Sequence, residues 1–193
     1  MIKLYDIDAV ELKINQRDYK DVSKEYLREN ITYIQKEDFF FDDTIFNNMK
    51  LGNENATDEE IIDLCKKVGI DDYINTLPEK YETVIGEGAF TLSSGQKQKL
   101  SLVRALLRNT KIYVCDEVTA NLDGQSEKNV VSIFKEVSKN AIVIFISHKI
   151  ASIVESDEIY LIDSGKVVDS GKHNKNQKGI HFIINCSRVL VEK

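Results

Sequence analysis

A short turn of small and hydroxyl-bearing residues precedes one amphipathic segment of the chain. Residues 92–96 read Leu-Ser-Ser-Gly-Gln, and apolar residues then recur at helical spacing. Such a turn places serine hydroxyls and backbone N–H groups at a helix N-terminus, where an anion is stabilised. Residues 97–111 contain five basic side chains and no acidic one, which favours the same chemistry. The other interpretation is that Ser93 or Ser94 only caps the helix.

Two apolar runs rich in β-branched residues are each followed by side chains that can act on a phosphate. Asp116 and Glu117 come directly after the run 112–115, and His148 follows the run 141–146. An Asp at a strand end can hold Mg²⁺ through water, and an adjacent Glu can polarise an attacking water. A histidine there can contact a phosphate. The alternatives are an ordinary solvated acidic loop and a structural histidine.

These two runs also predict the fold. Both are apolar on each face, and the segment 126–137 between them has helical spacing behind a Ser126 cap. A strand, a helix and a strand of this kind indicate a buried parallel sheet in an α/β fold. Because chemistry gathers at the carboxyl ends of strands in such sheets, we expect the acidic pair and His148 to meet there.

Local patterns predict several further elements. A capping box of Thr57 and Glu60 begins a helix that Gly69 ends. We also expect strands over residues 2–7 and 31–34, a helix over 19–28, and a hairpin over 158–168.

Composition excludes several classes of protein. The 193 residues are 42% hydrophobic and 30% charged with a net charge of −6, which argues against disorder and against a broad electrostatic footprint for nucleic acid. No apolar run is long enough to cross a bilayer, and the first residues lack the pattern of a secretory signal. The three cysteines share no metal-ligand spacing and cannot all pair, which favours a reducing compartment. We therefore expect a cytoplasmic domain.

The ordered set of segments resembles the ATP-binding cassette (ABC) ATPases. Within that resemblance, residues 92–100 are similar to the signature motif, 112–117 to the Walker B strand, 119–123 to the D-loop and 146–149 to the switch-histidine motif. Residues 39–48 and 83–88 resemble the exporter branch in particular, where the second segment touches the transmembrane coupling helices. Consecutive aromatics at 39–41 cannot all face one way, so at least one is expected to be available to a partner.

The resemblance implies a fold, ligands and partners. It implies one domain over residues 1–193 with a P-loop-NTPase-like parallel sheet and a helical signature subdomain at about 38–110. Glu117 would be the catalytic base, His148 a γ-phosphate contact and Asp116 the carboxylate that holds Mg²⁺ through water. ATP would be bound by Ser93, Ser94, Gly95, Gln96, Asp123 and Gln35. The implied partners are the transmembrane domains of an exporter and a second nucleotide-binding domain, at the inner face of the cell membrane, with no nucleic acid.

The chain departs from the family pattern in three places. It contains no Gly-x-x-x-x-Gly-Lys-Ser/Thr phosphate loop, so we expect the N-terminal strands and that loop, roughly 40 to 50 residues, to lie upstream of Met1. The glutamine of the family's Q-loop falls on Lys36, with Gln35 one place early. Ser94 stands where the signature usually has glycine.

Two main hypotheses remain from the sequence. The first is an exporter ATPase domain whose full-length or paired form hydrolyses ATP. The second is a truncated or degenerate cassette that is inactive alone and supplies its signature motif in trans to an intact partner. A third hypothesis, a soluble DNA-repair ATPase of the same superfamily, would need a coiled-coil insertion and a basic surface, and the sequence indicates neither.

Overall fold

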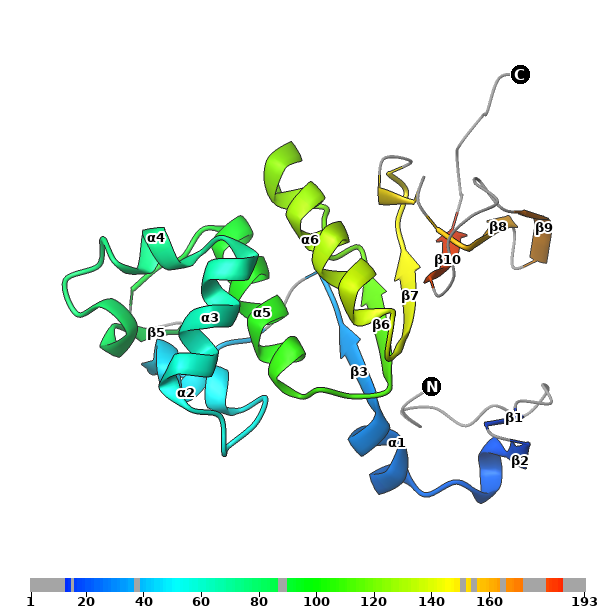
Figure 1. Cartoon of the computed structure of the whole chain (residues 1–193), viewed down its shortest axis with the longest axis horizontal. Helices are drawn as coiled ribbons and strands as arrows, with labels where there is room; N and C mark the ends of the chain where they lie inside the picture. The colour runs from blue at the N-terminus through cyan, green and yellow to red at the C-terminus, as the bar shows by residue number, and fades with distance from the viewer. Residues whose placement is uncertain are drawn as a thin grey trace.

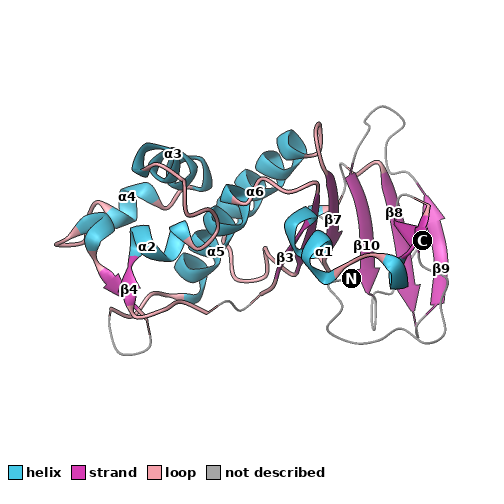
Figure 2. Ribbon diagram, turned by 90° about the horizontal axis from the view of Figure 1, so that it is seen from below, coloured by secondary structure: helices cyan, strands magenta, loops and turns pink. Residues whose placement is uncertain are grey.

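The computed structural model describes residues 13–14, 16–36, 39–86, 90–149, 152–153, 156–163, 166–171 and 180–185. These residues form an elongated molecule with a group of helices at one end and a sheet at the other (Figure 1, Figure 2). The strand expected over residues 2–7 lies outside the described residues. None of the described helices is long and apolar enough to cross a bilayer.

The sheet has six strands in the order β3-β6-β7-β10-β8-β9. All neighbouring pairs are parallel except β8 and β9, which are antiparallel and form the expected hairpin. The predicted parallel sheet is therefore confirmed. The strands are β3 (Ile31–Ile34), β6 (Ile112–Asp116), β7 (Ile142–Ile146), β8 (Glu158–Asp163), β9 (Lys166–Gly171) and β10 (Ile180–Asn185).

Alternate side chains of β6 pack on opposite faces of the sheet, as the two-residue period of a strand requires. Tyr113 faces helix α6 (Gly124–Val137), where its ring meets that of Phe134 at 5.9 Å, and Phe134 meets Phe145 of β7 at 5.4 Å. Val114 faces the other side and packs in a cluster with Leu27 of helix α1 (Lys24–Asn30). At β6 the sheet thus packs against α6 on one face and against the cluster of α1 on the other, which explains why this strand is apolar on both faces.

The helix predicted over residues 19–28 is wrong in its bounds. The chain forms a 3-10 turn, η1 (Tyr19–Asp21), and then α1, which begins after Ser23 because the Ser23 hydroxyl accepts a hydrogen bond from the Tyr26 N–H at 3.1 Å. A serine cap in an extended conformation separates the two helical turns. Before η1, β1 (Lys13–Ile14) and β2 (Arg17–Asp18) pair antiparallel.

The helical end of the molecule surrounds α5 (Ser94–Leu107), the helix that follows the 92–96 turn. The predicted helix after Thr57 is α3 (Asp58–Val68), with its capping box present and Gly69 in the left-handed conformation at its end, so both predicted boundaries are confirmed. The other elements are α2 (Ile45–Lys50), α4 (Asp71–Ile74), η2 (Lys80–Glu82), and the short antiparallel strands β4 (Asp43–Thr44) and β5 (Val84–Ile85).

One continuous apolar core joins the helical end to the sheet. It includes Met49 of α2, Ile61 of α3, Leu100 of α5 and Phe134 of α6, all fully buried. Helix α5 contacts both α2 and α3 and also reaches β3. The turn that begins α5 is therefore held by the same core that supports the carboxyl ends of the strands.

Candidate functional site

The carboxyl ends of β6 and β7 bring the predicted catalytic pair together. The Nδ1 atom of His148 lies 3.0 Å from Oε1 of Glu117, and the two strands pair in parallel up to Asp116 and Ile146. Glu117 has a left-handed backbone with φ of 49°, and its N–H donates to the Ile146 carbonyl at 2.9 Å. This uncommon conformation for a non-glycine residue is fixed by the neighbouring strand.

Asp116 has a partner that the sequence did not predict. The hydroxyl of Tyr33, on the adjacent strand β3, donates to Oδ2 of Asp116 at 2.6 Å. This hydrogen bond, together with burial and the charge of Asp116, raises the pKa of Tyr33 to about 12. Tyr33 therefore remains a neutral donor at physiological pH. The only signal in the sequence is that Tyr33 lies near the end of a strand, and pairing with β6 could not be known.

Lys36 lies at the same edge as Glu117. Its Nζ atom is 3.8 Å from Oε2 of Glu117, and both side chains are substantially exposed. Gln35, expected to bind the nucleotide, has its carbonyl oxygen 3.4 Å from Nε2 of the buried Gln98 of α5. The position of Lys36 thus places a cation beside the predicted base, where the family pattern has a neutral glutamine.

The 92–96 turn begins α5 with a capping box. The N–H of Gln96 donates to the Ser93 hydroxyl at 3.3 Å, and the N–H of Ser93 donates to Oε1 of Gln96 at 2.7 Å. Ser94 is the first residue of the helix. Both interpretations of the turn are thus compatible with the structure: Ser93 caps the helix, and the exposed helix N-terminus is still a site where anions are favoured.

Gly95 connects this turn to the segment after β6. A Cβ atom at Gly95 would lie 3.0 Å from the carbonyl oxygen of Asn121, tighter than nearly all real Cβ contacts. The signature-like turn and the D-loop-like segment therefore touch within one chain. The hydrogen bonds of Ser93 and Gln96 that the structure describes join them to each other, and they do not link the turn to Glu117 or His148.

The basic residues behind the turn are mostly held by neighbouring elements. Lys99 donates to the Gly69 carbonyl at 3.0 Å. Arg104 donates to the Phe39 carbonyl at 2.9 Å and lies over the Phe40 ring, and Arg108 donates to the Arg28 carbonyl at 2.6 Å. These cations therefore hold α5 against α1, the end of α3 and the 39–41 segment. They do not form one anion-binding site.

The cap predicted at Ser126 is wrong. Helix α6 begins at Gly124, and Asp123 is its cap, accepting from the N–H groups of Gln125 at 3.0 Å and Ser126 at 2.9 Å and from the Ser126 hydroxyl at 2.8 Å. These bonds, led by those from Ser126, lower the pKa of the Asp123 carboxyl. Aspartate and serine are equally good caps, and Asp123 comes first along the chain. Ser126 therefore lies within the first turn of the helix. Asp123, expected to bind the nucleotide, is thus also a structural acceptor.

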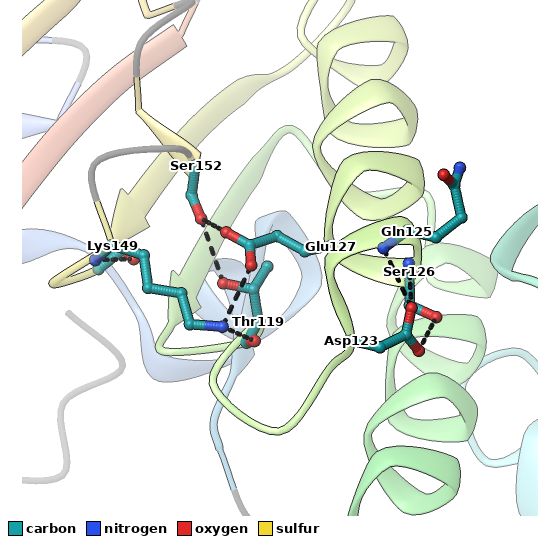
Figure 3. Close-up of polar contacts among 8 residues, drawn as sticks. Thr119, Asp123, Gln125, Ser126, Glu127, Lys149 and Ser152 are labelled. Atoms are coloured by element: carbon teal, nitrogen blue, oxygen red, sulfur yellow. Dashed lines mark hydrogen bonds and ion pairs between the residues drawn. The ribbon is translucent and has the colours of Figure 1, made fainter.

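A polar network not predicted from the sequence joins the segments around His148 and Glu117 (Figure 3). The Nζ atom of Lys149 donates to the Thr119 carbonyl at 2.9 Å and to Oε2 of Glu127 at 3.1 Å. The Ser152 hydroxyl donates to Oε1 of Glu127 and lies 3.3 Å from the Thr119 hydroxyl. Its hydrogen-bonded side chains are 22 to 33 residues from their partners along the chain, so no local spacing indicates it.

Aromatic residues form a surface beside the site. Phe39 and Phe41 are 54% and 55% exposed with ring centroids 5.0 Å apart, whereas Phe40 between them is buried. The two exposed rings line a groove of about 490 Å³ together with Leu51 and Gly52. The expectation that at least one of these rings is available agrees with this exposure. In the 83–88 segment, residues 87–88 lie outside the described residues, while Val84 is exposed.

The described residues fit a magnesium ion only in part. They contain no group of three or more His, Cys, Asp or Glu side chains that could hold a metal by themselves. Asp116 offers one carboxylate oxygen beyond the one bonded to Tyr33, which suits a single contact through water with the phosphates supplying other ligands.

Comparison with known proteins gives the family. A sequence model described as ABC transporter matches residues 1–120. ABC transporter B family member 24, mitochondrial, of Arabidopsis thaliana is 36% identical over 173 residues, which are 90% of this chain and 25% of that protein. Iron-sulfur clusters transporter ABCB7, mitochondrial, of Danio rerio is 35% identical over 90% of this chain and 23% of that protein.

A solved structure agrees with these relatives. A bacterial Atm1-family ABC exporter with ATP bound superposes with a TM-score of 0.84 at 30% identity, covering 89% of this chain and 30% of that one. The chain thus spans about a quarter of the length of these two relatives and 30% of the length of the exporter structure. It belongs to the ABC transporter family, as a nucleotide-binding domain of the exporter type.

Proposed function

We propose that the chain is the part of an ABC exporter that couples ATP hydrolysis to transport across a membrane. The observation that carries the proposal is the 3.0 Å contact between Glu117 and His148 at the carboxyl ends of adjacent parallel strands. In this arrangement Glu117 takes the proton of the attacking water, and His148 contacts the γ-phosphate. When bound, Mg²⁺ would neutralise phosphate charge, and Asp116 would hold it through water.

The position of the His148 proton follows from the contact with Glu117. An ionised carboxylate only accepts hydrogen bonds, so the Nδ1 atom of the imidazole carries the proton that lies toward Oε1. Phosphate oxygens also only accept hydrogen bonds, so contact with the γ-phosphate requires a proton on Nε2 as well, as in the imidazolium form. The carboxylate of Glu117 is therefore oriented by the same residue that would contact the phosphate.

The 193 residues contain no phosphate loop, so the ATP that these side chains act on must be cradled by residues outside them. The turn at residues 92–96 supplies the complementary surface: an exposed helix N-terminus with serine hydroxyls that can close over the phosphates of a second cassette. A second nucleotide-binding domain is accordingly the proposed partner on this face.

The exposed rings of Phe39 and Phe41 support a second partner. They lie next to the β4–β5 pair, which carries the exposed Val84, and together these residues present apolar surface at the helical end of the molecule. We assign this surface to the transmembrane domains of the exporter, which places the chain at the inner face of the membrane. An apolar patch of this kind needs a partner to cover it.

The second candidate function is an inactive cassette that only supplies its signature turn. The Lys36 ammonium at 3.8 Å from Glu117 favours it, because a cation paired with this carboxylate occupies the group that would accept the proton of the attacking water. In that case ATP would be hydrolysed only in the partner's site, and Glu117 and His148 would be dispensable.

One experiment separates the two candidates. The chain is joined to an upstream segment that carries a phosphate loop, so that Glu117 and His148 have an ATP site of their own, and it is paired with an intact exporter cassette. ATPase activity is then measured for Glu117→Gln and Ser93→Asp variants of the chain. Aspartate caps a helix as well as serine but repels phosphate, so Ser93→Asp retains the fold while blocking closure. Loss of activity in both variants supports the ATPase, whereas loss in Ser93→Asp alone supports the inactive cassette.

The chain by itself provides a further check. Without a phosphate loop it should bind ATP only weakly, and calorimetry at millimolar nucleotide would measure this. Micromolar affinity would contradict the argument that the cradle comes from elsewhere, and no change of partner ATPase on adding the chain would contradict both candidates.

A further inference from the structure

Lys149 immediately follows His148 and reaches back to the segment that follows Glu117. Its Nζ atom donates to the Thr119 carbonyl, two residues beyond Glu117, and to the Glu127 carboxylate on α6. Its backbone N–H donates to the Ser147 hydroxyl at 3.0 Å. Ser147 and Lys149, on the two sides of His148, are therefore hydrogen-bonded to each other. The side chain of Lys149 joins them to the segment after Glu117 and to α6.

The Glu127 carboxylate is the centre of this arrangement (Figure 3). Oε2 accepts from Lys149 and Oε1 accepts from the Ser152 hydroxyl, so each oxygen holds one side chain of the segment after β7. Because Glu127 is in the first turn of α6, close to the Asp123 cap, it also fixes this segment to the helix. The carboxylate thus joins the segment after β7 to α6, and Lys149 and Ser152 extend the contact to Thr119.

Burial distinguishes this ion pair from the others among the residues that the structure describes. The side chain of Glu127 is 12% exposed and that of Lys149 is 29% exposed. On the same helix, Glu136 pairs with Lys139 at 2.5 Å, but these side chains are 73% and 64% exposed. Removing one partner of a mostly buried pair leaves an uncompensated charge, whereas an exposed pair contributes little.

We propose that Lys149 and Glu127 are positioning residues, which hold the His148 segment against the turn after Glu117 so that Nδ1 of His148 stays on Oε1 of Glu117. The proposal rests on the proposed function for its consequence in catalysis, but the geometry itself is a property of the chain alone. The opposing explanation is that the pair stabilises the fold and has no effect on His148.

The decisive experiment observes the imidazole directly. Nitrogen NMR of the three histidines in the full chain, assigned with a His148→Gln variant and recorded above the ordinary imidazole pKa of about 6.5, reports which ring nitrogen carries the proton. The parent should show His148 in the Nδ1–H form. In Lys149→Met and Glu127→Gln variants, His148 should move to a mixture of the two tautomers.

Two further variants serve as controls for this test. Glu136→Gln removes the exposed partner on the same helix and should leave the His148 signal unchanged. Lys149→Arg retains a cation with several donors and should restore the parent signal if Lys149→Met destabilises the fold. An unaltered His148 signal in both Lys149→Met and Glu127→Gln, with circular dichroism showing folded protein, would overturn the positioning role.

The consequence for catalysis is measured separately, in the complex with an intact cassette. Because small misplacements of a catalytic group can cost up to about 100-fold, Glu127→Gln should lower kcat by roughly 10- to 100-fold with KM nearly unchanged. If the His148 signal shifts while kcat is retained, positioning stands and the proposed role of His148 in hydrolysis is contradicted. If the parent complex hydrolyses ATP no faster than the intact cassette alone, the proposed function fails, and the NMR result still decides the positioning role.

Discussion

Gly52 is a position where one added methyl group would meet the backbone of a neighbouring helix. It follows α2, and a Cβ atom there would lie 2.2 Å from the carbonyl oxygen of Arg104 in α5 and 3.2 Å from that of Met49. The φ angle of Gly52 is outside the left-handed region, so alanine is compatible with the backbone itself. A Gly52→Ala variant therefore isolates the close approach of two helices.

The size of the effect follows from that distance. Ordinary van der Waals contact begins near 3.4 Å, so α2 and α5 must separate by more than about 1 Å. Overpacking of this kind costs about 1–3 kcal/mol, and the smaller entropy of the unfolded alanine chain offsets about 0.4–1 kcal/mol. We expect a net loss of about 1–2 kcal/mol, which for a chain of this length lowers Tm by about 2–8 °C.

Thermal and urea unfolding followed by circular dichroism measure this difference. Gly124→Ala at the start of α6 is the matched control, because a Cβ there meets nothing within 4 Å, and its Tm should stay level or rise. Arg104 also holds the Phe39 carbonyl, so the shift should move the aromatic surface as well. If Gly52→Ala is as stable as the parent, the approach of α2 to α5 is looser than described and the reasoning is refuted.

Three further predictions concern the edge of the sheet and the helix caps. Lys36→Gln removes an exposed ion pair with Glu117 worth about 0.2–1 kcal/mol and leaves the carboxylate to accept a proton, so ATPase of the complex should rise about 1.5- to 5-fold. A fall would show that Lys36 assists Glu117. Asp123→Asn removes a carboxyl whose pKa is lowered by folding. The difference in Tm between parent and variant should therefore be full at pH 6 and should shrink as the pH falls below about 4. An equal difference at both pH values would contradict this. Thr57→Ala removes the cap of α3 and should cost about 1 kcal/mol in urea unfolding, an effect that Thr57→Ser should largely avoid.

The sequence predicts those parts of the fold that depend on local patterns. The continuous apolar runs become β6 and β7, which pair in parallel, and their carboxyl ends then bring Glu117 and His148 together. The capping box at Thr57 and the left-handed Gly69 bound α3 through contacts within a few residues. In each case the decisive interaction lies within one element or between two neighbouring strands.

The parts that were missed depend on choices between similar residues or on distant pairing. Ser126 and Asp123 are both good caps, and only the conformation of the turn before α6 decides between them. β10 was not predicted, and it lies between β7 and β8, far from both in the sequence. Tyr33 reaches Asp116 only because β3 pairs with β6, 83 residues later.

The capping role of Ser93 does not exclude the phosphate contact proposed for it. A serine hydroxyl both donates and accepts hydrogen bonds, and in the cap it accepts one from the Gln96 N–H. Its own proton can still be donated to a phosphate oxygen. The cap then orients the hydroxyl in advance, which reduces the entropy lost when an anion binds. The same turn therefore begins helix α5 and prepares the surface that would close over ATP, so a choice between cap and ligand is not required by the chemistry.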